Sequence, residues 1–141
     1  MEVKIVASDQ ELQDAYMVRK EVFIVEQNVP VELEMDEYDA KAIHFVGYEE
    51  DEPICASRLR FVDSYGKLER ICVRREARGK SYGKQIIAAM EKQITVRGYP
   101  KAKLNAQTHA IGFYESLGYE VVSEEFMDAG IPHVTMIKTL E

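Results

Sequence analysis

Several kinds of residue and segment are scarce in this sequence, and each shortage excludes a class of protein. There is no tryptophan, and the two cysteines, Cys55 and Cys72, lie in apolar stretches where we expect buried, reduced thiols. No stretch approaches the roughly 20 apolar residues that span a bilayer. The start, MEVKIVASDQ, lacks the basic and apolar regions of a signal peptide. We therefore expect a cytoplasmic protein that does not act at a membrane.

Positive charge is also scarce. The chain has 18 Lys and Arg against 25 Asp and Glu, which gives a formal net charge of -7. Because nucleic-acid affinity depends on clustered Lys and Arg, we do not expect nucleic acid as the main partner. An acidic surface would suit a cationic substrate such as an amine, or would simply keep the protein soluble. The three histidines are far apart, and no Cys/His spacing resembles a zinc site, so we predict no metal.

The chain reads as a single domain over residues 1–141, because it has no repeat, linker or low-complexity segment. Ser8 and Glu11 form a capping box, which predicts a helix start, and Pro30 with the acidic run after it predicts a loop or short second helix. Period-2 and period-3.6 patterns predict the other elements. Strands are expected at 2–7, 42–50, 53–62, 67–73, 103–106, 119–123 and 133–140, and further helices at 82–97 and 110–117. This order predicts a mixed α/β domain with a largely antiparallel front half.

The stretch that carries chemistry is KLERICVRREARGKSYGK, residues 67–84. A strand ends at Val73, a basic loop that contains glycine follows, and an amphipathic helix begins directly afterwards. The first amide groups of a helix have no internal partner and carry partial positive charge, and glycine lets a phosphate approach them closely. The loop therefore predicts a phosphate site made of Arg78, Gly79, Lys80, Ser81, Tyr82, Gly83 and Lys84.

Two other phosphate-binding motifs can be compared with this loop. Gly79-Lys80-Ser81 resembles the end of a nucleotide P-loop, but that motif needs glycine at position 74, where this chain has Arg74. A dinucleotide site needs Gly-x-Gly-x-x-Gly, which is absent. On this loop alone, a solvated basic loop that caps an ordinary helix stays open.

A family resemblance emerges from two motifs together. The run from Arg78 to Gly83 resembles the pyrophosphate loop of the GNAT family of N-acetyltransferases, Gln/Arg-x-x-Gly-x-Gly/Ala, with Ser81 where the family usually has glycine. The run LNAQTHAIGFYESLGY, residues 104–119, resembles the family pattern Asn-x-x-Ala-x-x-x-Tyr-x-x-x-Gly-Phe. Tyr114 is among the matches, whereas Gln107 replaces the asparagine. The matching residues in this second motif are Ala110, Tyr114 and Gly118, and Tyr119 replaces the phenylalanine.

Two further segments, RKEVFIVEQ at 19–27 and DAGIPH at 128–133, resemble the ElaA-like bacterial subgroup of the family. The resemblance implies a GNAT-like α/β fold, in which a mostly antiparallel sheet splays between two strands and is flanked by helices. It implies acetyl-CoA as the acetyl donor and a small-molecule or peptide amine as acceptor, of unknown identity. It also leaves a homodimer possible. The alternative is a non-catalytic CoA-binding or protein-interaction module on the same scaffold.

The resemblance also implies roles for particular residues. Acetyl-CoA would lie between the strand that ends at Val73 and strand 103–106, with the loop 78–84 on its pyrophosphate. Its pantetheine arm would contact the main chain of Ile71, Cys72 and Val73 and the side chains of Asn105 and Gln107.

Catalysis needs a base, because amines are mostly protonated at neutral pH. Glu69 is the first candidate for this base, and Glu26 and His133 are others. Tyr114 would protonate the leaving thiolate, and Phe23 would wall the acceptor pocket. For each charged residue, a surface charge or a structural hydrogen bond is the alternative.

Overall fold

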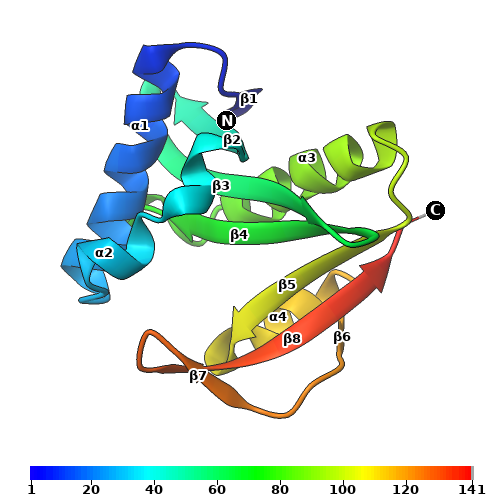
Figure 1. Cartoon of the computed structure of the whole chain (residues 1–141). Coiled ribbons are helices and arrows are strands. Elements are labelled where there is room, and N and C mark those ends of the chain that lie inside the picture. The colour runs from blue at the N-terminus through cyan, green and yellow to red at the C-terminus, as the bar shows by residue number, and fades with distance from the viewer. Residues whose placement is uncertain (141) are drawn as a thin grey trace.

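The structure, a computed structural model, describes residues 1–140 as one mixed α/β unit (Figure 1). The strands are β1 Glu2–Ile5, β2 Ile43–Glu49, β3 Glu52–Val62, β4 Tyr65–Val73, β5 Lys101–Gln107, β6 Glu120–Val121, β7 Phe126–Asp128 and β8 Ile131–Thr139. The α-helices are α1 Asp9–Arg19, α2 Val31–Glu34, α3 Tyr82–Val96 and α4 Ile111–Ser116. A π-helix follows α1 at Lys20–Glu26, and 3-10 turns lie at Glu37–Ala40, Arg75–Ala77 and Thr108–Ala110.

The sheet has the order β1-β2-β3-β4-β5-β8-β6, with β7 paired to β8. Every pairing is antiparallel except that of β4 with β5, which is parallel. The β4–β5 ladder joins Tyr65–Leu68 to Lys101–Leu104 and stops there. Figure 1 shows the two strands moving apart beyond this point. The expected fold, a mostly antiparallel sheet that splays between two strands and is flanked by helices, is confirmed.

Two helices cover opposite faces of the sheet. Side chains alternate between faces along a strand, so neighbours such as Phe45 and Val46 belong to different clusters. Phe45 packs with Ile86, Met90 and Ile94 of α3, whereas Val46 packs with Ala15, Val18 and Val22 on the other face. The helix α1 begins where the capping box predicts, because the Ser8 hydroxyl accepts a hydrogen bond from the Glu11 amide. No helix within residues 1–140 is long and apolar enough to cross a membrane.

Three local features depart from the sequence-based expectation. The chain after α1 continues as a π-helix, a rare form that is frequent at functional sites. Residues 124–132, which lie between the strands expected at 119–123 and 133–140, contain β7 and a tight hairpin, in which Ala129 (φ +51°) and Gly130 (φ +75°) form the turn. Strand β4 carries one extra residue opposite β3, between Glu69 and Cys72, and Arg70 takes a left-handed conformation there (φ +57°).

Candidate active site

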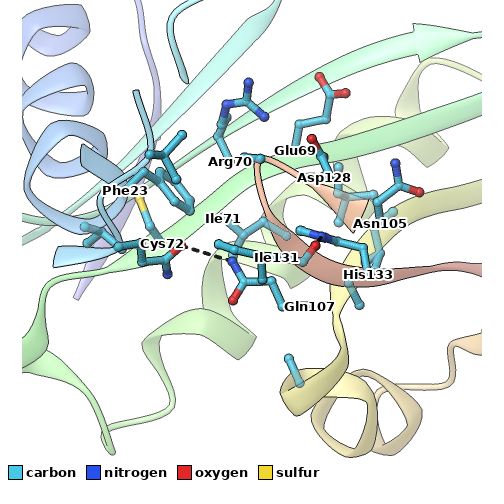
Figure 2. Close-up of a pocket in the computed structure, with 18 of the residues that line it drawn as sticks. Phe23, Glu69, Arg70, Ile71, Cys72, Asn105, Gln107, Asp128, Ile131 and His133 are labelled. Atoms are coloured by element: carbon cyan, nitrogen blue, oxygen red, sulfur yellow. Dashed lines mark hydrogen bonds between the residues drawn. The ribbon is translucent and has the colours of Figure 1, made fainter. Parts of the chain in front are cut away.

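A cleft of about 670 Å³ lies where β4 and β5 separate. Residues 69–73 of β4 form one wall and residues 105–107 of β5 form the other, while the π-helix and the β7–β8 hairpin close its ends. Figure 2 shows Ile71 and Cys72 on one side and Asn105 and Gln107 on the other. Because no strand in the described chain pairs with this edge of β4, its main-chain groups are available to an extended ligand.

A smaller hollow of about 320 Å³ adjoins the cleft at the start of α3. Gly79, Ser81, Gly83 and Lys84 line it. Ser81 precedes the helix in a left-handed conformation (φ +64°), and within residues 1–140 its side chain caps none of the first-turn amides. Those amides therefore keep their donors for an anion, and the helix dipole favours negative charge there.

Arg78 joins the loop to the cleft. Its Nε donates to the Val73 carbonyl at 2.9 Å, and its two Nη atoms donate to the Glu26 carboxylate at 2.7 and 2.8 Å. This bidentate contact lowers the pKa of Glu26 from its ordinary value. Arg78 is thus fixed at the mouth of both hollows.

Two predicted loop residues, Lys80 and Tyr82, pair with Glu49 and do not line the larger cleft, although Tyr82 lines the smaller hollow. Lys80 lines neither hollow in the part of the chain described here, and its ammonium lies 3.7 Å from the Glu49 carboxylate. The Tyr82 hydroxyl donates to the same carboxylate, and its ring is buried against Ile54 and Ala77. The Lys80 and Tyr82 side chains therefore hold the loop against the body of the protein.

Tyr114 lines the cleft from α4. Its ring lies edge-on to Phe113 and Tyr119, with ring centres 5.1 and 6.0 Å away. Burial raises the pKa of its hydroxyl to about 12, so the group stays protonated at neutral pH. No residue among 1–140 accepts a hydrogen bond from this hydroxyl, which leaves its proton free for a ligand.

Glu69 also lines the cleft, but its carboxylate is already neutralised. Arg58 and Arg60 donate to it at 2.9 and 2.7 Å, and the Lys67 ammonium lies 3.2 Å away. Burial alone would raise its pKa, but these three cations outweigh it and lower the pKa to about 2. A carboxylate with so low a pKa is a poor proton acceptor, so the expectation that Glu69 is the base is not supported.

His133 and Asn105 face the same end of the cleft from β8 and β5 (Figure 2). The His133 Nδ1 lies 2.7 Å from the Ile131 carbonyl oxygen. Since a carbonyl can only accept, Nδ1 is the donor in this contact, and Nε2 is the ring nitrogen that can hold a lone pair. Stacking on Phe126, with ring centres 6.0 Å apart, holds the ring in place.

Cys72 contributes its main chain to the cleft but no reactive thiol. Its Sγ donates to the Ala56 carbonyl at 3.7 Å, and burial raises its pKa well above the usual range. Within the described residues, no three His, Cys, Asp or Glu side chains form a group that could hold a metal ion.

Sequence reasoning missed several cleft residues. Val29, Leu33 and Ile131 make an apolar surface in the cleft, and Asp128, the last residue of β7, lines the same cleft. They lie in or beside the one-turn helix α2 and at the two strand ends that flank the hairpin turn, where too few residues follow one another to give a periodic pattern. Only the DAGIPH motif could have signalled part of this set. A further residue that shapes the site, the fully buried Arg58, has no sequence signal at all.

Comparisons with known proteins agree with this geometry. Residues 4–140 match the model of the acetyltransferase (GNAT) domain. YjcF of Bacillus subtilis (strain 168), an uncharacterised N-acetyltransferase, is 48% identical over 98% of this chain and 99% of its own length. A solved structure from Lactobacillus plantarum is 31% identical, with a TM-score of 0.93 and coverage of 99% and 98%. Escherichia coli ElaA is 26% identical, with a TM-score of 0.86 and coverage of 97% and 98%. The chain therefore belongs to the GNAT acetyltransferase family.

Proposed function

We propose that this protein is an N-acetyltransferase that moves an acetyl group from acetyl-CoA to the amine of a small molecule or peptide. One observation carries the proposal: the edge of β4 that pairs with no strand among residues 1–140 leads directly to the basic loop at the start of α3. An extended pantetheine arm can pair with such an edge as an added strand does, while the pyrophosphate reaches the helix N-terminus.

The donor is held along the whole cleft in this proposal. The main chain of Ile71, Cys72 and Val73 pairs with the pantetheine arm, and an amide there polarises the thioester carbonyl. Asn105 and Gln107 contact the arm from β5. The first-turn amides of α3, with the Arg78 and Lys84 side chains, bind the pyrophosphate.

The acceptor enters from the end lined by Phe23, Leu33 and His133. The amine nitrogen must lose a proton before its lone pair can attack the thioester carbonyl carbon. We assign this proton to Nε2 of His133, because the Ile131 carbonyl fixes the opposite ring nitrogen as the donor. A C–N bond forms, the C–S bond breaks, and the sulfur leaves as a thiolate. The new amide nitrogen gives its surplus proton to solvent, and His133 releases its own proton to solvent as well.

The thiolate then takes the Tyr114 proton. A phenol with a pKa of about 12 remains protonated at neutral pH. After transfer, solvent returns a proton to the phenolate, and the products are an amide and free CoA. Glu69 takes no part in proton transfer here; with Arg58 and Arg60 it supports the bulged part of β4.

Titration calorimetry with CoA tests the proposed cleft, together with thermal unfolding. Ligand at about 100 times its Kd adds roughly 2.7 kcal/mol to the free energy of unfolding. For a domain of this size that raises Tm by several degrees. No heat and an unmoved Tm at millimolar CoA would reject the cofactor assignment and leave a protein-interaction module on this scaffold.

A further inference from the structure

The segment Lys20–Gln27, made of the π-helix and the residue after it, touches both walls of the cleft. On one side Glu26 pairs with Arg78, and on the other Gln27 pairs with Gln107. Arg78 and Gln107 are both side chains that the proposed function gives to acetyl-CoA. This segment therefore already pairs with two of the side chains that would bind the donor.

The contact to Arg78 is the stronger of the two. Both guanidinium Nη atoms donate to Glu26, at 2.7 and 2.8 Å, and an Nη atom of Arg75 lies 3.6 Å from the same carboxylate. A bidentate guanidinium–carboxylate pair satisfies both groups at once. A phosphate oxygen has the same preference for a guanidinium fork, so a bound pyrophosphate competes directly with Glu26 for Arg78.

The side-chain amide of Gln107 makes one contact at each of its two polar atoms. Its Nε2 donates to the Gln27 Oε1 at 3.0 Å, and its Oε1 lies 2.7 Å from the His109 Nε2. In Figure 2 a dashed line runs to the labelled Gln107 side chain of β5. A pantetheine amide that bonds to Gln107 therefore approaches an amide that already has a partner at each polar atom.

Glu26 differs from the other paired carboxylates of the cleft. Glu34 and Glu69 each keep a buried partner, Arg19 and Arg58, whose side chains are 0% and 1% exposed. Their other partners, Arg70 for Glu34 and Arg60 and Lys67 for Glu69, are part-exposed, so loss of one of these still leaves each carboxylate paired. Glu26 is held mainly by Arg78, which is 40% exposed and lies on the expected path of the pyrophosphate. Of these carboxylates, Glu26 is the one that the donor can release.

We propose that acetyl-CoA uncovers Glu26 as the carboxylate that holds the cationic acceptor: the pyrophosphate takes Arg78, and Glu26 becomes free for an ammonium group. The inference rests on the proposed function and adds a coupling between its two sites. Phe23 lies on the same segment and walls the acceptor end, so the freed carboxylate is already on the acceptor's side. Linkage makes the coupling reciprocal, because an acceptor bound to Glu26 leaves Arg78 to the donor.

The first test compares CoA binding by the parent, Glu26→Gln and Glu21→Gln. Glu21 is the matched control, because it lies on the same π-helix and pairs at 2.6 Å with Arg74, which lines neither hollow among residues 1–140. Partly exposed ion pairs of this kind contribute only modestly to the free energy, so release of Arg78 from Glu26 should change CoA affinity by a small factor. Glu26→Gln should therefore bind CoA about two- to fivefold more tightly, with Glu21→Gln unchanged. Equal or weaker binding by Glu26→Gln would overturn the inference.

The second test asks directly whether CoA uncovers Glu26. A carbodiimide couples glycine ethyl ester to accessible carboxylates, and peptide mass spectrometry measures coupling at Glu26 and Glu21 in one sample. Saturating CoA should raise coupling at Glu26 about fivefold and leave Glu21 unchanged; no rise, or protection of Glu26, would contradict the inference. If none of the three proteins binds CoA, the proposed function itself fails, which separates that failure from a failure of the coupling alone.

Discussion

Replacing Gly83 with alanine should move stability and donor affinity in opposite directions. Gly83 is the second residue of α3, has ordinary helical backbone angles and lines both hollows. A Cβ built on it would lie 3.8 Å from Phe113 Cζ and from Val73 Cγ2, which is ordinary van der Waals contact. The added methyl therefore fits the ligand-free fold, and it occupies the space through which a phosphate would approach the helix amides.

The two magnitudes follow from these contacts. A helical glycine-to-alanine change that fits without strain stabilises by about 0.5–1 kcal/mol. That corresponds to roughly 2–4 °C in Tm for a domain of this size. Loss of one hydrogen bond to a charged group costs about 1.5–3 kcal/mol, or about a 10- to 100-fold rise in the Kd for CoA.

The assay is a pair of measurements on one variant, thermal unfolding without ligand and CoA titration by calorimetry. Gly112→Ala is the matched control: Gly112 lies in α4, and an added Cβ there meets no atom within 4 Å. It should share any gain in Tm while keeping parental CoA affinity. If Gly83→Ala kept the parental CoA affinity, the proposed phosphate site at the start of α3 would be refuted. An equal loss of CoA affinity in Gly112→Ala would refute it as well. Gly83→Val should show the same loss of affinity with less gain in stability.

Three other outcomes are expected. Ser81→Gly relieves the strain of a left-handed backbone at this residue, which is on the order of 1 kcal/mol, so its CoA affinity should equal or exceed the parent's. A tenfold loss of CoA affinity would show that the Ser81 hydroxyl itself binds phosphate. Tyr114→Phe should lower kcat by about 10²–10⁴-fold with CoA affinity unchanged; a kcat within threefold of the parent's would remove Tyr114 from the mechanism. Glu69 and Asp39 have pKa values lowered to about 2, so the stability they contribute is present above their unfolded values near 4 and is lost as pH falls from about 5 towards 2. Each group accounts for at most about 3 kcal/mol of that loss, and a Tm that stays flat between pH 5 and pH 2.5 would contradict these shifts.

Much of the fold could be predicted because its elements follow clear periods. The face of α3 that carries Ile86, Met90 and Ile94 is buried as its spacing indicates, and the capping box sets the start of α1. The π-helix could not be predicted, because KEVFIVE has no spacing that separates a π-helix from an α-helix. The β7–β8 hairpin was missed because Ala129 takes a positive φ that sequence rules reserve for glycine or asparagine.

The site was predictable where a motif encodes local geometry and not where long-range contacts decide. The loop before α3 and the position of Tyr114 come from short contiguous patterns, and both line the hollows. Glu69 was chosen as a base for its place beside the thioester, but its partners Arg58 and Arg60 come from β3 and set its pKa. The contact of Glu26 with Arg78 joins residues 52 positions apart, which no motif shows.

Amine-dependent release of free thiol from acetyl-CoA measures the proposed acetyl transfer itself. The panel should include small amines, aminoglycosides, polyamines, amino acids and lysine peptides, with mass spectrometry to find the acetylated product. If the protein is an N-acetyltransferase, at least one amine will accelerate thiol release well above the rate without amine and will carry the acetyl group on its nitrogen. This acceleration will be lost in Tyr114→Phe. CoA binding without amine-dependent thiol release from any class would contradict the claim and identify a non-catalytic CoA-binding protein.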